Sequence, residues 1–563
     1  MTIKFPLGND NFSEIRKNGD YYIDKTDFIK ELLNNSFKAN LITRPRRFGK
    51  TLTMSMLEDF FHIRNDSRQD FAGLKISEYS DLCAEWMNQW PVIFLTLKSV
   101  EGNDFDSAWG MLKILVSDLC KKYSYLEESE SVDKDDVICF QELKARKGKP
   151  EDIKDCLHLL MRMMNAHYGK PVILLIDEYD VPLAKASEAG YYTKMLDVIR
   201  ILLGKALKTN DFLKFAVVTG CLKIAKESIF TGTNNFVSDT ITGERFNEYI
   251  GFTESDVGKI LADTGFPDHA EEVKTWYNGY RFGSVEVYCP WDVLNHVAAL
   301  QIKPDTAPQY HWENTSHNGI IRRFIDRDDL WREEHINEDF ELLMDGGYIV
   351  KTITENLTYD MLHSSADNIW SLLYLTGYLT QVPASEASGT DPAPGRLALR
   401  IPNEEVRHIF KSSITSWFED SVKATGRNEL FDALWGQDEQ KCSKIISDML
   451  FRTISFHDYK EDFYHAFVAG ILSFAGYKVI SNREQGDGRS DILLCDEQRH
   501  KAVIIEIKRS RTVKSMAKMC DEALMQIRKK RYAEALEDEY DEIICYGISF
   551  FKKRCMVKVG HCK

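Results

Sequence analysis

The chain has 563 residues, of which 44% are hydrophobic and 12% aromatic, and its formal net charge is -15. This length exceeds one ordinary hydrophobic core, so we expect about two to four folded domains. The acidic balance argues against a protein that coats nucleic acid along its whole surface, but it allows a local basic site. No apolar run reaches the roughly 18 to 20 residues that a membrane span requires.

The amino terminus and the cysteines indicate a cytoplasmic protein. The opening residues, MTIKFPLGND, lack the basic start and the apolar stretch of a secretory signal. The twelve cysteines are scattered without a CxxC pair, which favours reduced thiols over disulfides or a zinc site built from cysteines. We therefore expect a cytoplasmic protein that makes no membrane contact.

In the amino-terminal region, short apolar runs alternate with helical stretches, a pattern typical of an α/β fold with a parallel sheet. We assign residues 1–252 to this domain. Its acidic stretch LEESESVDKDD, at 126–136, indicates a solvated insertion or loop. The expected strands are residues 37–43, 92–97, 172–177, 214–219 and 236–241.

Residues 253–459 form a mostly helical middle region. Within it, SLLYLTGYLTQV at 371–382 predicts a helix that runs into a strand, and RLALRIP at 396–402 predicts a second strand. The segment 383–395 between them is rich in Pro, Gly, Ala and Ser, as at an exposed tip. A helix followed by such a hairpin indicates a winged helix over about 340–415, but an ordinary helical linker domain with one hairpin fits equally well.

The last region, residues 460–563, begins with an amphipathic helix, EDFYHAFVAGILSFAG. A long basic helix is expected between its third and fourth strands. Ten Lys and Arg lie between 501 and 531 against three acids, so this end is basic within an acidic protein. The expected strands are residues 477–482, 491–495, 502–508 and 542–550.

The segment TRPRRFGKTL, residues 43–52, ends like a phosphate-binding loop. The usual pattern G-x-x-x-x-G-K-[ST] begins with a glycine, and Arg44 stands in its place. A predicted strand leads into this loop and a predicted helix follows it, which is the context that phosphate binding needs. We expect Lys50 to contact phosphate and Thr51 to bind Mg²⁺. The other loop residues expected around the nucleotide are Arg44, Arg46, Arg47, Phe48, Gly49 and Leu52.

Two further strand ends support a nucleotide site. The run PVILLIDEYD delivers Asp177 and Glu178 at its carboxyl end, where P-loop ATPases hold Mg²⁺ through an acid or its coordinated water. Glu178 would polarise the attacking water as a general base, and Thr219, at the end of the strand 214–219, suits a γ-phosphate sensor. These patterns predict ATP and Mg²⁺ as cofactors, although a strand that simply ends in solvated acids is the alternative.

The basic carboxyl-terminal region carries a second pattern of acids with a lysine. Glu506 and Lys508, in AVIIEIKRS, are two residues apart and so share one face of a strand. Asp491 begins the preceding strand, and the turn DEQRH makes the two strands a hairpin. Asp491 and Glu506 would then chelate Mg²⁺, or Mn²⁺, through oxygen. Lys508 would orient the water that the metal activates or neutralise developing charge.

An exposed pair of Glu506 and Lys508 fits this strand poorly. AVIIEI is nearly all apolar and should be buried on both faces. A buried acid and a buried lysine at the end of such a strand need a compensating function.

Eight motifs resemble those of bacterial AAA-ATPase-like proteins: FPLGNDNFSEIR, YYIDKTDFI, RPRRFGKTLTMSML, LLIDEYD, TGCLKIAKESIF, GFTESDV, WYNGYRF and YCPWDVLN. In that family a divergent P-loop ATPase domain, of the ASCE type, is fused to a C-terminal PD-(D/E)xK nuclease-like domain. The resemblance implies that RPRRFGKT, with Arg44, is the family's usual loop and that residues 21–26 flank the base. Arg245 and Arg281 are candidates for γ-phosphate arginines, although such residues are more often structural.

The resemblance also adds residues to the carboxyl-terminal site. Glu461 and His465 are four residues apart on the first helix of this region and share a face. Gln526 matches the family's glutamine on the helix after the ExK strand, and the basic turns around it would lie near phosphates. Taken alone, His465 is better explained as a packing residue. The motif's proline is absent, since an arginine and a serine precede Asp491.

As a whole the sequence predicts an ATPase joined to a metal-dependent nuclease that acts on nucleic acid, with DNA favoured over RNA. One alternative is a nucleotide-dependent switch or interaction protein whose nuclease-like domain binds without cleaving. A second is an ATPase motor with no cleavage. A homo-oligomer stays open, because many P-loop ATPases assemble into rings.

Overall fold

The chain divides into two compact units in the computed structural model. The first comprises Met1–Asn314 and Val350–Arg407, and the second comprises Thr315–Ile349 and His408–Lys563. Residues of the predicted middle region, 253–459, belong to both units, and the predicted division into three domains stays a prediction. The structure describes residues 3–35, 37–223, 236–311, 339–340, 342–357, 366–383, 385–387, 395–410, 427–452, 461–472, 478–485, 488–496, 499–536 and 539–561.

The first unit is built on a parallel sheet with the strand order β2-β3-β4-β1-β5. Each of its strands coincides with a predicted one, so that part of the fold prediction is confirmed. β4 lies between β1 and β3, which is the added strand of the expected ASCE type. β1 and β3 are buried along their whole length, which explains why most of their residues are apolar. The bounds are β1 (Ala39–Thr43), β2 (Val92–Thr96), β3 (Val172–Asp177), β4 (Leu213–Gly220) and β5 (Phe236–Asp239).

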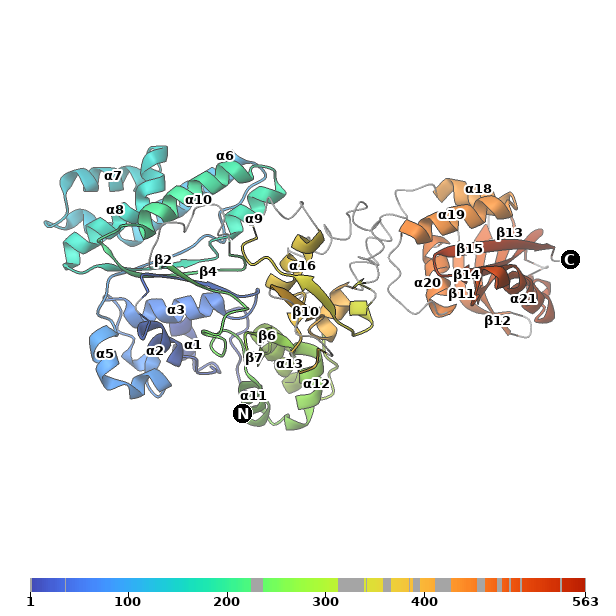
Figure 1. Ribbon diagram of the computed structural model, residues 1–563, viewed down its shortest axis with the longest axis horizontal. Coiled ribbons are helices and arrows are strands. Elements are labelled where there is room, and N and C mark those ends of the chain that lie inside the picture. Colours follow the sequence, from blue (N-terminus) through green and yellow to red (C-terminus); the bar gives the residue numbers. More distant parts are fainter. Residues whose placement is uncertain are drawn as a thin grey trace. The chain divides into compact units, whose positions relative to one another are not determined.

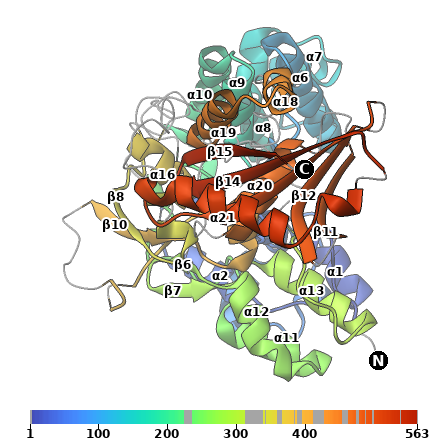
Figure 2. The same ribbon diagram turned by 90° about the vertical axis from the view of Figure 1, so that its right-hand side faces the viewer.

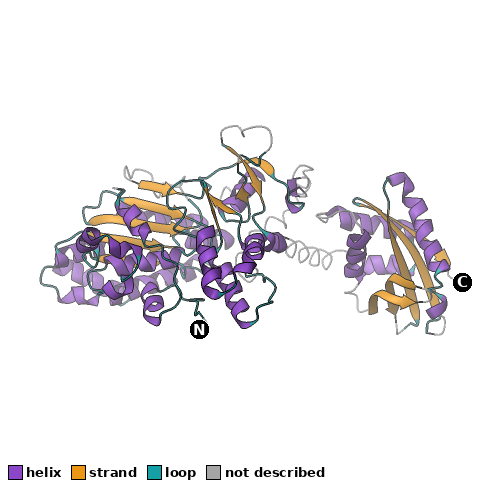
Figure 3. Ribbon diagram, turned by 90° about the horizontal axis from the view of Figure 1, so that it is seen from below, coloured by secondary structure: helices purple, strands orange, loops and turns teal. Residues whose placement is uncertain are grey.

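Helices cover both faces of this sheet, as burial of a parallel sheet requires. Figure 1 shows α6, α8 and α10 on one face and α1, α2 and α3 on the other. Figure 3 distinguishes the helices from the strands by colour. The bounds are α1 (Phe12–Asn18), α2 (Asp27–Leu33), α3 (Lys50–Phe61), α4 (Arg68–Phe71), η1 (Lys75–Glu78), α5 (Ser80–Trp86), α6 (Phe105–Lys122), η2 (Ser124–Glu128), α7 (Lys134–Lys144), α8 (Pro150–Tyr168), α9 (Val181–Glu188) and α10 (Tyr192–Leu207).

The acidic stretch at 126–136 differs from the predicted loop, because both of its ends are helical. It begins inside η2 and ends in the first turn of α7. The side chain of Asp133 caps α7 by accepting a hydrogen bond from the N–H of Asp135. One acidic residue of the predicted loop, Asp133, is therefore the N-terminal cap of a helix. Its carboxylate accepts a hydrogen bond from a backbone N–H that has no partner within the helix.

The rest of the first unit follows β5. The helix and hairpin predicted at 371–402 are present as α16, β9 and β10, while most of the tip, 384 and 388–394, lies outside the described residues; the winged helix stays a prediction. β8 joins this hairpin in the order β8-β10-β9. The bounds are α11 (Glu254–Thr264), η3 (Pro267–His269), α12 (Ala270–Tyr277), β6 (Tyr280–Phe282), β7 (Val285–Val287), α13 (Pro290–Ile302), β8 (Ile349–Thr352), α16 (Ala366–Leu375), β9 (Thr380–Gln381) and β10 (Arg396–Arg400).

The second unit is built on a mixed sheet with the order β11-β12-β13-β14-β15. Only β13 and β14 are parallel, and α21 lies in the crossover that connects them. β15, an edge strand, is absent from the sequence prediction. The strands are β11 (Lys478–Gln485), β12 (Gly488–Asp496), β13 (Lys501–Arg509), β14 (Glu542–Phe551) and β15 (Arg554–His561).

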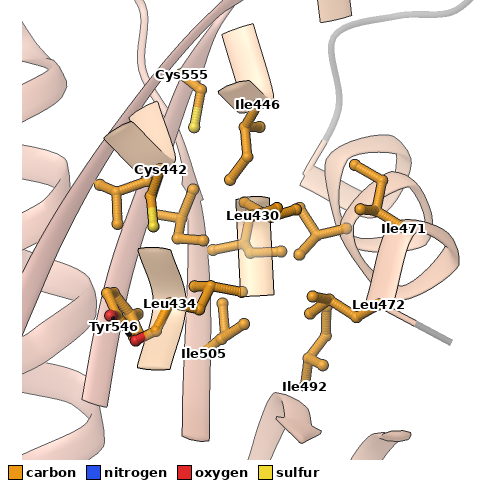
Figure 4. Packing of buried hydrophobic residues seen from close by; sticks show 14 of the residues in the cluster. Leu430, Leu434, Cys442, Ile446, Ile471, Leu472, Ile492, Ile505, Tyr546 and Cys555 are labelled. Carbon is orange, nitrogen blue, oxygen red and sulfur yellow. Dashed lines mark hydrogen bonds between the residues drawn. The ribbon is translucent and has the colours of Figure 1, made fainter. Parts of the chain in front are cut away.

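Helices also cover both faces of the mixed sheet. α21 lies on one face (Figure 2) and α18, α19 and α20 on the other. Figure 4 shows the core on the second face, where helix side chains such as Leu430 and Ile446 meet strand side chains such as Ile492 and Ile505. Each such side chain contributes about 1.5–3 kcal/mol when fully buried. The bounds are α18 (Arg427–Trp435), α19 (Glu439–Arg452), α20 (Glu461–Leu472), η6 (Val513–Ser515), α21 (Met516–Lys529) and η7 (Glu534–Leu536).

Two bulk predictions are tested by the described part of the chain. Within it, no helix combines the length and the apolar character needed to cross a bilayer. Ten cysteines are free thiols, whereas Cys545 is disulfide-bonded. The expectation of reduced thiols is therefore confirmed for those ten and wrong for Cys545.

Candidate functional sites

The phosphate loop connects β1 to α3, as the sequence predicts. Arg47 has φ 68° and Gly49 has φ 90°, so the loop passes twice through left-handed backbone. Glycine adopts this conformation freely, while a non-glycine residue pays about 1–3 kcal/mol for it. The ammonium of Lys50 lies inside the resulting turn, where it donates to the carbonyl oxygens of Arg44 at 3.0 Å and Pro45 at 2.7 Å.

Three predicted site residues from separate motifs meet at the carboxyl ends of the strands. The hydroxyl of Thr51 donates to Oδ2 of Asp177 at 2.8 Å, and the hydroxyl of Thr219 donates to Oδ1 at 2.5 Å. Asp177 is only 1% exposed. The parallel register explains the meeting, because the ends of β1, β3 and β4 lie level with one another. Asp177 thus forms one polar centre with residues 126 and 42 positions away in the sequence.

Glu178, the predicted general base, follows β3 directly. Its φ is 51°, a conformation that non-glycine residues keep only when the surroundings enforce it. Burial and the neighbouring Asp177 raise the pKa of its carboxyl, while Lys50 and Arg46 oppose that rise. A carboxylate whose pKa is moved towards neutrality suits proton abstraction from water.

The side chain of Arg44 makes buried contacts within the first unit. It is fully buried and forms an ion pair with Oδ2 of Asp239 at 3.1 Å. It also donates to Oδ1 of Asn247 at 3.1 Å and to the carbonyl of Arg245 at 3.0 Å. These contacts fasten the loop to β5 and the segment after it. The guanidinium therefore makes structural contacts, and its predicted place beside the nucleotide stays a prediction.

Phe48 and Arg47 also point into packed surroundings. Phe48 is 1% exposed, and its ring lies 5.0 Å from that of Tyr280 and 5.2 Å from that of Phe282. The ring therefore packs in the core, and its predicted contact with the nucleotide stays a prediction. The guanidinium of Arg47 lies 5.1 Å from the Trp291 ring centre and donates to the carbonyl of His311.

Two predicted loop residues remain beside the polar centre. Arg46 is half-buried and is close enough to Glu178 and Asp180 to interact with both electrostatically. Leu52 lies in the first turn of α3 and is half-buried. Arg46 is therefore the loop arginine best placed to act with the predicted general base.

Asp180 is a residue of this site that the sequence reasoning missed. Its Oδ2 accepts hydrogen bonds from the N–H groups of Cys221 and Leu222, both at 2.9 Å. A Cβ on Gly220 would lie 2.6 Å from Oδ1 of Asp180 and 2.7 Å from the Tyr179 ring. The end of LLIDEYD thus braces the turn that follows Thr219. The sequence contains a signal for this residue, because Asp180 is the second aspartate of the LLIDEYD motif.

The arginines and tyrosines that the family resemblance suggested lie in other contacts. Arg245 donates to Oδ1 of Asn40, near the start of β1, at 3.1 Å. The backbone N–H of Arg281 donates to the Thr380 hydroxyl at 2.9 Å. Within the segment 21–26, the hydroxyl of its first tyrosine donates to Asp263 of α11 at 2.6 Å. A γ-phosphate role for Arg245 receives no support from this packed position.

The second candidate site lies on the hairpin of β12 and β13. Ile492 pairs with Ile505, so Asp491 and Glu506 take the next position of the antiparallel register. Oδ2 of Asp491 accepts from the N–H of Ile507 at 2.7 Å. The sequence prediction that these two acids meet at one end of a hairpin is thereby supported by the geometry.

Glu506 is held by the predicted lysine and glutamine. Its Oε1 accepts from Nζ of Lys508 at 3.2 Å and from Nε2 of Gln526 on α21. Its other oxygen, Oε2, is buried and has no hydrogen-bond partner in the described part of the chain. The carboxylate is 1% exposed. A buried orphan carboxylate oxygen beside a second acid is the donor set that a hard divalent cation binds.

The charges around Glu506 also favour a bound divalent cation. Burial, and after it the charge of Asp491, raise the pKa of Glu506 to about 7, although Lys508 opposes this rise. Two carboxylates in one partly dehydrated place repel each other unless a proton or a cation lies between them. The residues present therefore fit the Mg²⁺ or Mn²⁺ that the sequence predicts.

The remaining predicted residues of this site lie on α20. His465 bonds through Nε2 to the carbonyl oxygen of Asp491 at 2.7 Å, so its ring supports the strand that carries the acid. Glu461 is the first residue of α20, but its side chain lies outside the described residues. His465 thus positions the strand that carries Asp491, and its predicted catalytic role stays a prediction.

Comparisons with known proteins match the two regions of the chain that contain these candidate sites. Residues 6–230 match the family model described as predicted AAA-ATPase, and residues 459–560 match the model of the PD-(D/E)XK nuclease superfamily. An uncharacterized protein in the vnfD 5′ region of Azotobacter chroococcum mcd 1 is similar, with 25% identity over 444 residues, which cover 77% of this chain and 75% of that protein. The chain therefore joins an AAA-ATPase-like domain to a C-terminal domain of the PD-(D/E)XK nuclease superfamily.

Proposed function

We propose that the protein binds and hydrolyses ATP at the first site and cleaves nucleic acid phosphodiesters at the second. The observation that carries the proposal is Glu506, buried beside Asp491 and held by Lys508 and Gln526. A purely structural role does not explain a buried carboxylate with one oxygen left unpaired, because that arrangement costs stability. The ATP cycle would control when the second site acts.

In the ATPase half, Lys50 would exchange the carbonyl oxygens of the loop for phosphate oxygens. Thr51 and Asp177, already hydrogen-bonded to each other, would hold Mg²⁺, which neutralises charge that develops on the phosphates. Thr219 contacts the other oxygen of Asp177 and would transmit the loss of the γ-phosphate to β4. Glu178 would orient the attacking water and take its proton.

In the nuclease half, Asp491 and Glu506 would hold Mg²⁺ or Mn²⁺. A bound cation of this kind lowers the pKa of its water and stabilises charge on the phosphate. Lys508 lies beside Glu506 and would orient the water. Arg528 and Lys529 are exposed on the last turn of α21, just after Gln526, and would pair with backbone phosphates. We expect DNA as the preferred substrate.

The direct test is cleavage of DNA and RNA with Mg²⁺ or Mn²⁺, with and without ATP. Asp491→Ala and Lys508→Ala should each reduce the rate by about a hundredfold or more, because each removes a group that touches the reacting centre. Lys518→Ala is the matched control, since Lys518 is an exposed lysine of α21 paired with Glu522. Equal cleavage by all four proteins would refute the nuclease assignment. Nucleic acid binding without cleavage would instead support an interaction role.

A separate test addresses the phosphate loop. ATP titration of Lys50→Ala should show at least tenfold weaker binding, because the variant lacks the amine that meets phosphate. Lys121→Ala, on the exposed side of α6 and paired with Asp118, is the control. Equal affinity of Lys50→Ala and the parent protein would show that the loop is not the nucleotide site.

A further inference from the structure

Two histidines and a glutamate cluster in the first unit, among residues that neither proposed site uses. His269 ends η3, Glu272 lies in the first turn of α12, and His296 lies on α13. Oε1 of Glu272 is 3.0 Å from Nδ1 of His269 and 3.2 Å from Nε2 of His296. The three atoms all lie within 4.8 Å of one another.

We propose that His269, Glu272 and His296 bind one Zn²⁺ ion, with water as the fourth ligand. Zinc–nitrogen and zinc–oxygen bonds of about 2.0–2.1 Å in a tetrahedron place neighbouring ligand atoms about 3.3 Å apart. The two separations from Glu272, 3.0 and 3.2 Å, lie close to that value. Two imidazoles with one carboxylate are a donor set that suits Zn²⁺ better than Mg²⁺, which prefers oxygen ligands alone.

The burial of the cluster suits a metal site that is rigid on one side and open on the other. The side chain of His296 is 0% exposed, whereas those of His269 and Glu272 are 26% and 37% exposed. The ring of Tyr277 lies 5.5 Å from that of His296, and the ring of Phe266 lies 5.9 Å from that of His269. Packing thus fixes both imidazoles, while the exposed edge provides a path for the ion and its water.

One of the three residues, His296, lies on α13, and the first turn of this helix contacts the phosphate loop. Cys289, the N-cap of α13, donates through Sγ to the carbonyl of Arg47 at 3.6 Å, and Trp291 packs against the guanidinium of the same arginine. A metal that joins α12 to α13 would therefore stabilise the wall against which the loop packs. Ligands that bind only the folded chain raise its stability in this way.

The competing explanation is a plain hydrogen-bonded cluster, because the same separations suit hydrogen bonds from two neutral imidazoles to one carboxylate. Metal binding distinguishes the two. The full chain, stripped with a chelator and kept in excess Mg²⁺ to fill hard oxygen sites, is titrated with Co²⁺ as a spectroscopic substitute for zinc. Thermal unfolding with and without Zn²⁺ is the second readout.

We expect one Co²⁺ per chain, with the visible bands of a tetrahedral site and without the near-ultraviolet absorption of a thiolate ligand. Glu272→Gln, which preserves shape and can still accept hydrogen bonds, and His269→Ala should each weaken binding at least tenfold. Both should also lose the rise in melting temperature that Zn²⁺ causes. His158→Ala is the matched control, since His158 is a similarly exposed histidine that pairs with an acid, Asp155, on α8.

The result that overturns the proposal is a parent chain that binds no Co²⁺ under these conditions, or variants of Glu272 and His269 that bind as tightly as the His158 control. The conservative Glu272→Gln change keeps the test decisive even if the histidine variant folds poorly. Loss of binding in that variant, with an unchanged melting temperature in the absence of metal, supports a zinc site and excludes general unfolding.

Discussion

Replacing Glu506 by glutamine should stabilise the metal-free protein at pH 8. The folded chain holds a proton on Glu506 more tightly than the unfolded chain does, because burial raises the pKa of this carboxyl from 4.5 to about 7. The stability that this proton contributes is fully present below about pH 4.5 and is lost as the pH rises through about 7. A neutral amide at position 506 cannot lose such a proton.

The size of the effect follows from the two pKa values. The difference between 4.5 and about 7 corresponds to about 3 kcal/mol when Glu506 is fully ionised. Part of this gain in stability is lost again in the variant, because a glutamine oxygen is a weaker hydrogen-bond acceptor than a carboxylate for Lys508 and Gln526. We therefore expect a net stabilisation of about 1–2 kcal/mol at pH 8 and none at pH 5.

Amide hydrogen exchange of the full chain measures this stabilisation in the strands around position 506. In the presence of a chelator, the amides of β12, β13 and β14 should exchange about 5–30 times more slowly in Glu506→Gln than in the parent at pH 8. Mn²⁺ should slow exchange in the parent and leave the variant unchanged, because the variant lacks a charged ligand. Glu522→Gln, a substitution of a partly exposed acid on α21, controls for the loss of one negative charge.

Two outcomes would contradict this reasoning. Equal protection of parent and Glu506→Gln at pH 8 would mean that the buried carboxylate costs no stability. Equal gains at pH 5 and pH 8 would mean that the gain comes from packing and not from ionisation. Either result would remove the electrostatic argument for a cation at Asp491 and Glu506.

Three further predictions concern the first unit. Arg44→Met should cost about 3–5 kcal/mol in urea unfolding, because it leaves Asp239 as an unpaired buried charge; a loss below about 1 kcal/mol would contradict the structural role. Gly220→Ala should cost about 1–3 kcal/mol in thermal unfolding and weaken ATP binding, since its Cβ would lie 2.6 Å from Asp180, and an unchanged protein would show that the turn relaxes. Burial and the nearby Glu405 raise the pKa of Asp292 far above its ordinary value. The folded chain therefore loses stability as the pH rises, because the buried carboxyl is driven to ionise. Asp292→Asn should therefore raise the melting temperature more at pH 8 than at pH 5, and identical shifts would argue against titration.

Much of both sites was predictable because the signals are local. A strand buried on both faces is mostly apolar, which is why β1, β3 and β4 can be recognised in the sequence. Parallel strands bring their carboxyl ends to one edge, so polar residues there, such as Asp177 and Thr219, were expected to meet. The pairing of Asp491 with Glu506 follows in the same way from a short hairpin, whose register depends only on neighbouring residues.

What the tertiary structure alone decided is where side chains go once elements pack. Nothing in RPRRFGKT shows that Arg44 turns inward to Asp239, which lies about two hundred residues later in the chain. The bond from His465 to the backbone of Asp491, and the convergence of His269 and Glu272 on His296, likewise depend on contacts between separate elements. Local sequence determines which residues form a strand, a turn or a helix. The direction in which a charged side chain is buried depends on partners that only packing brings near.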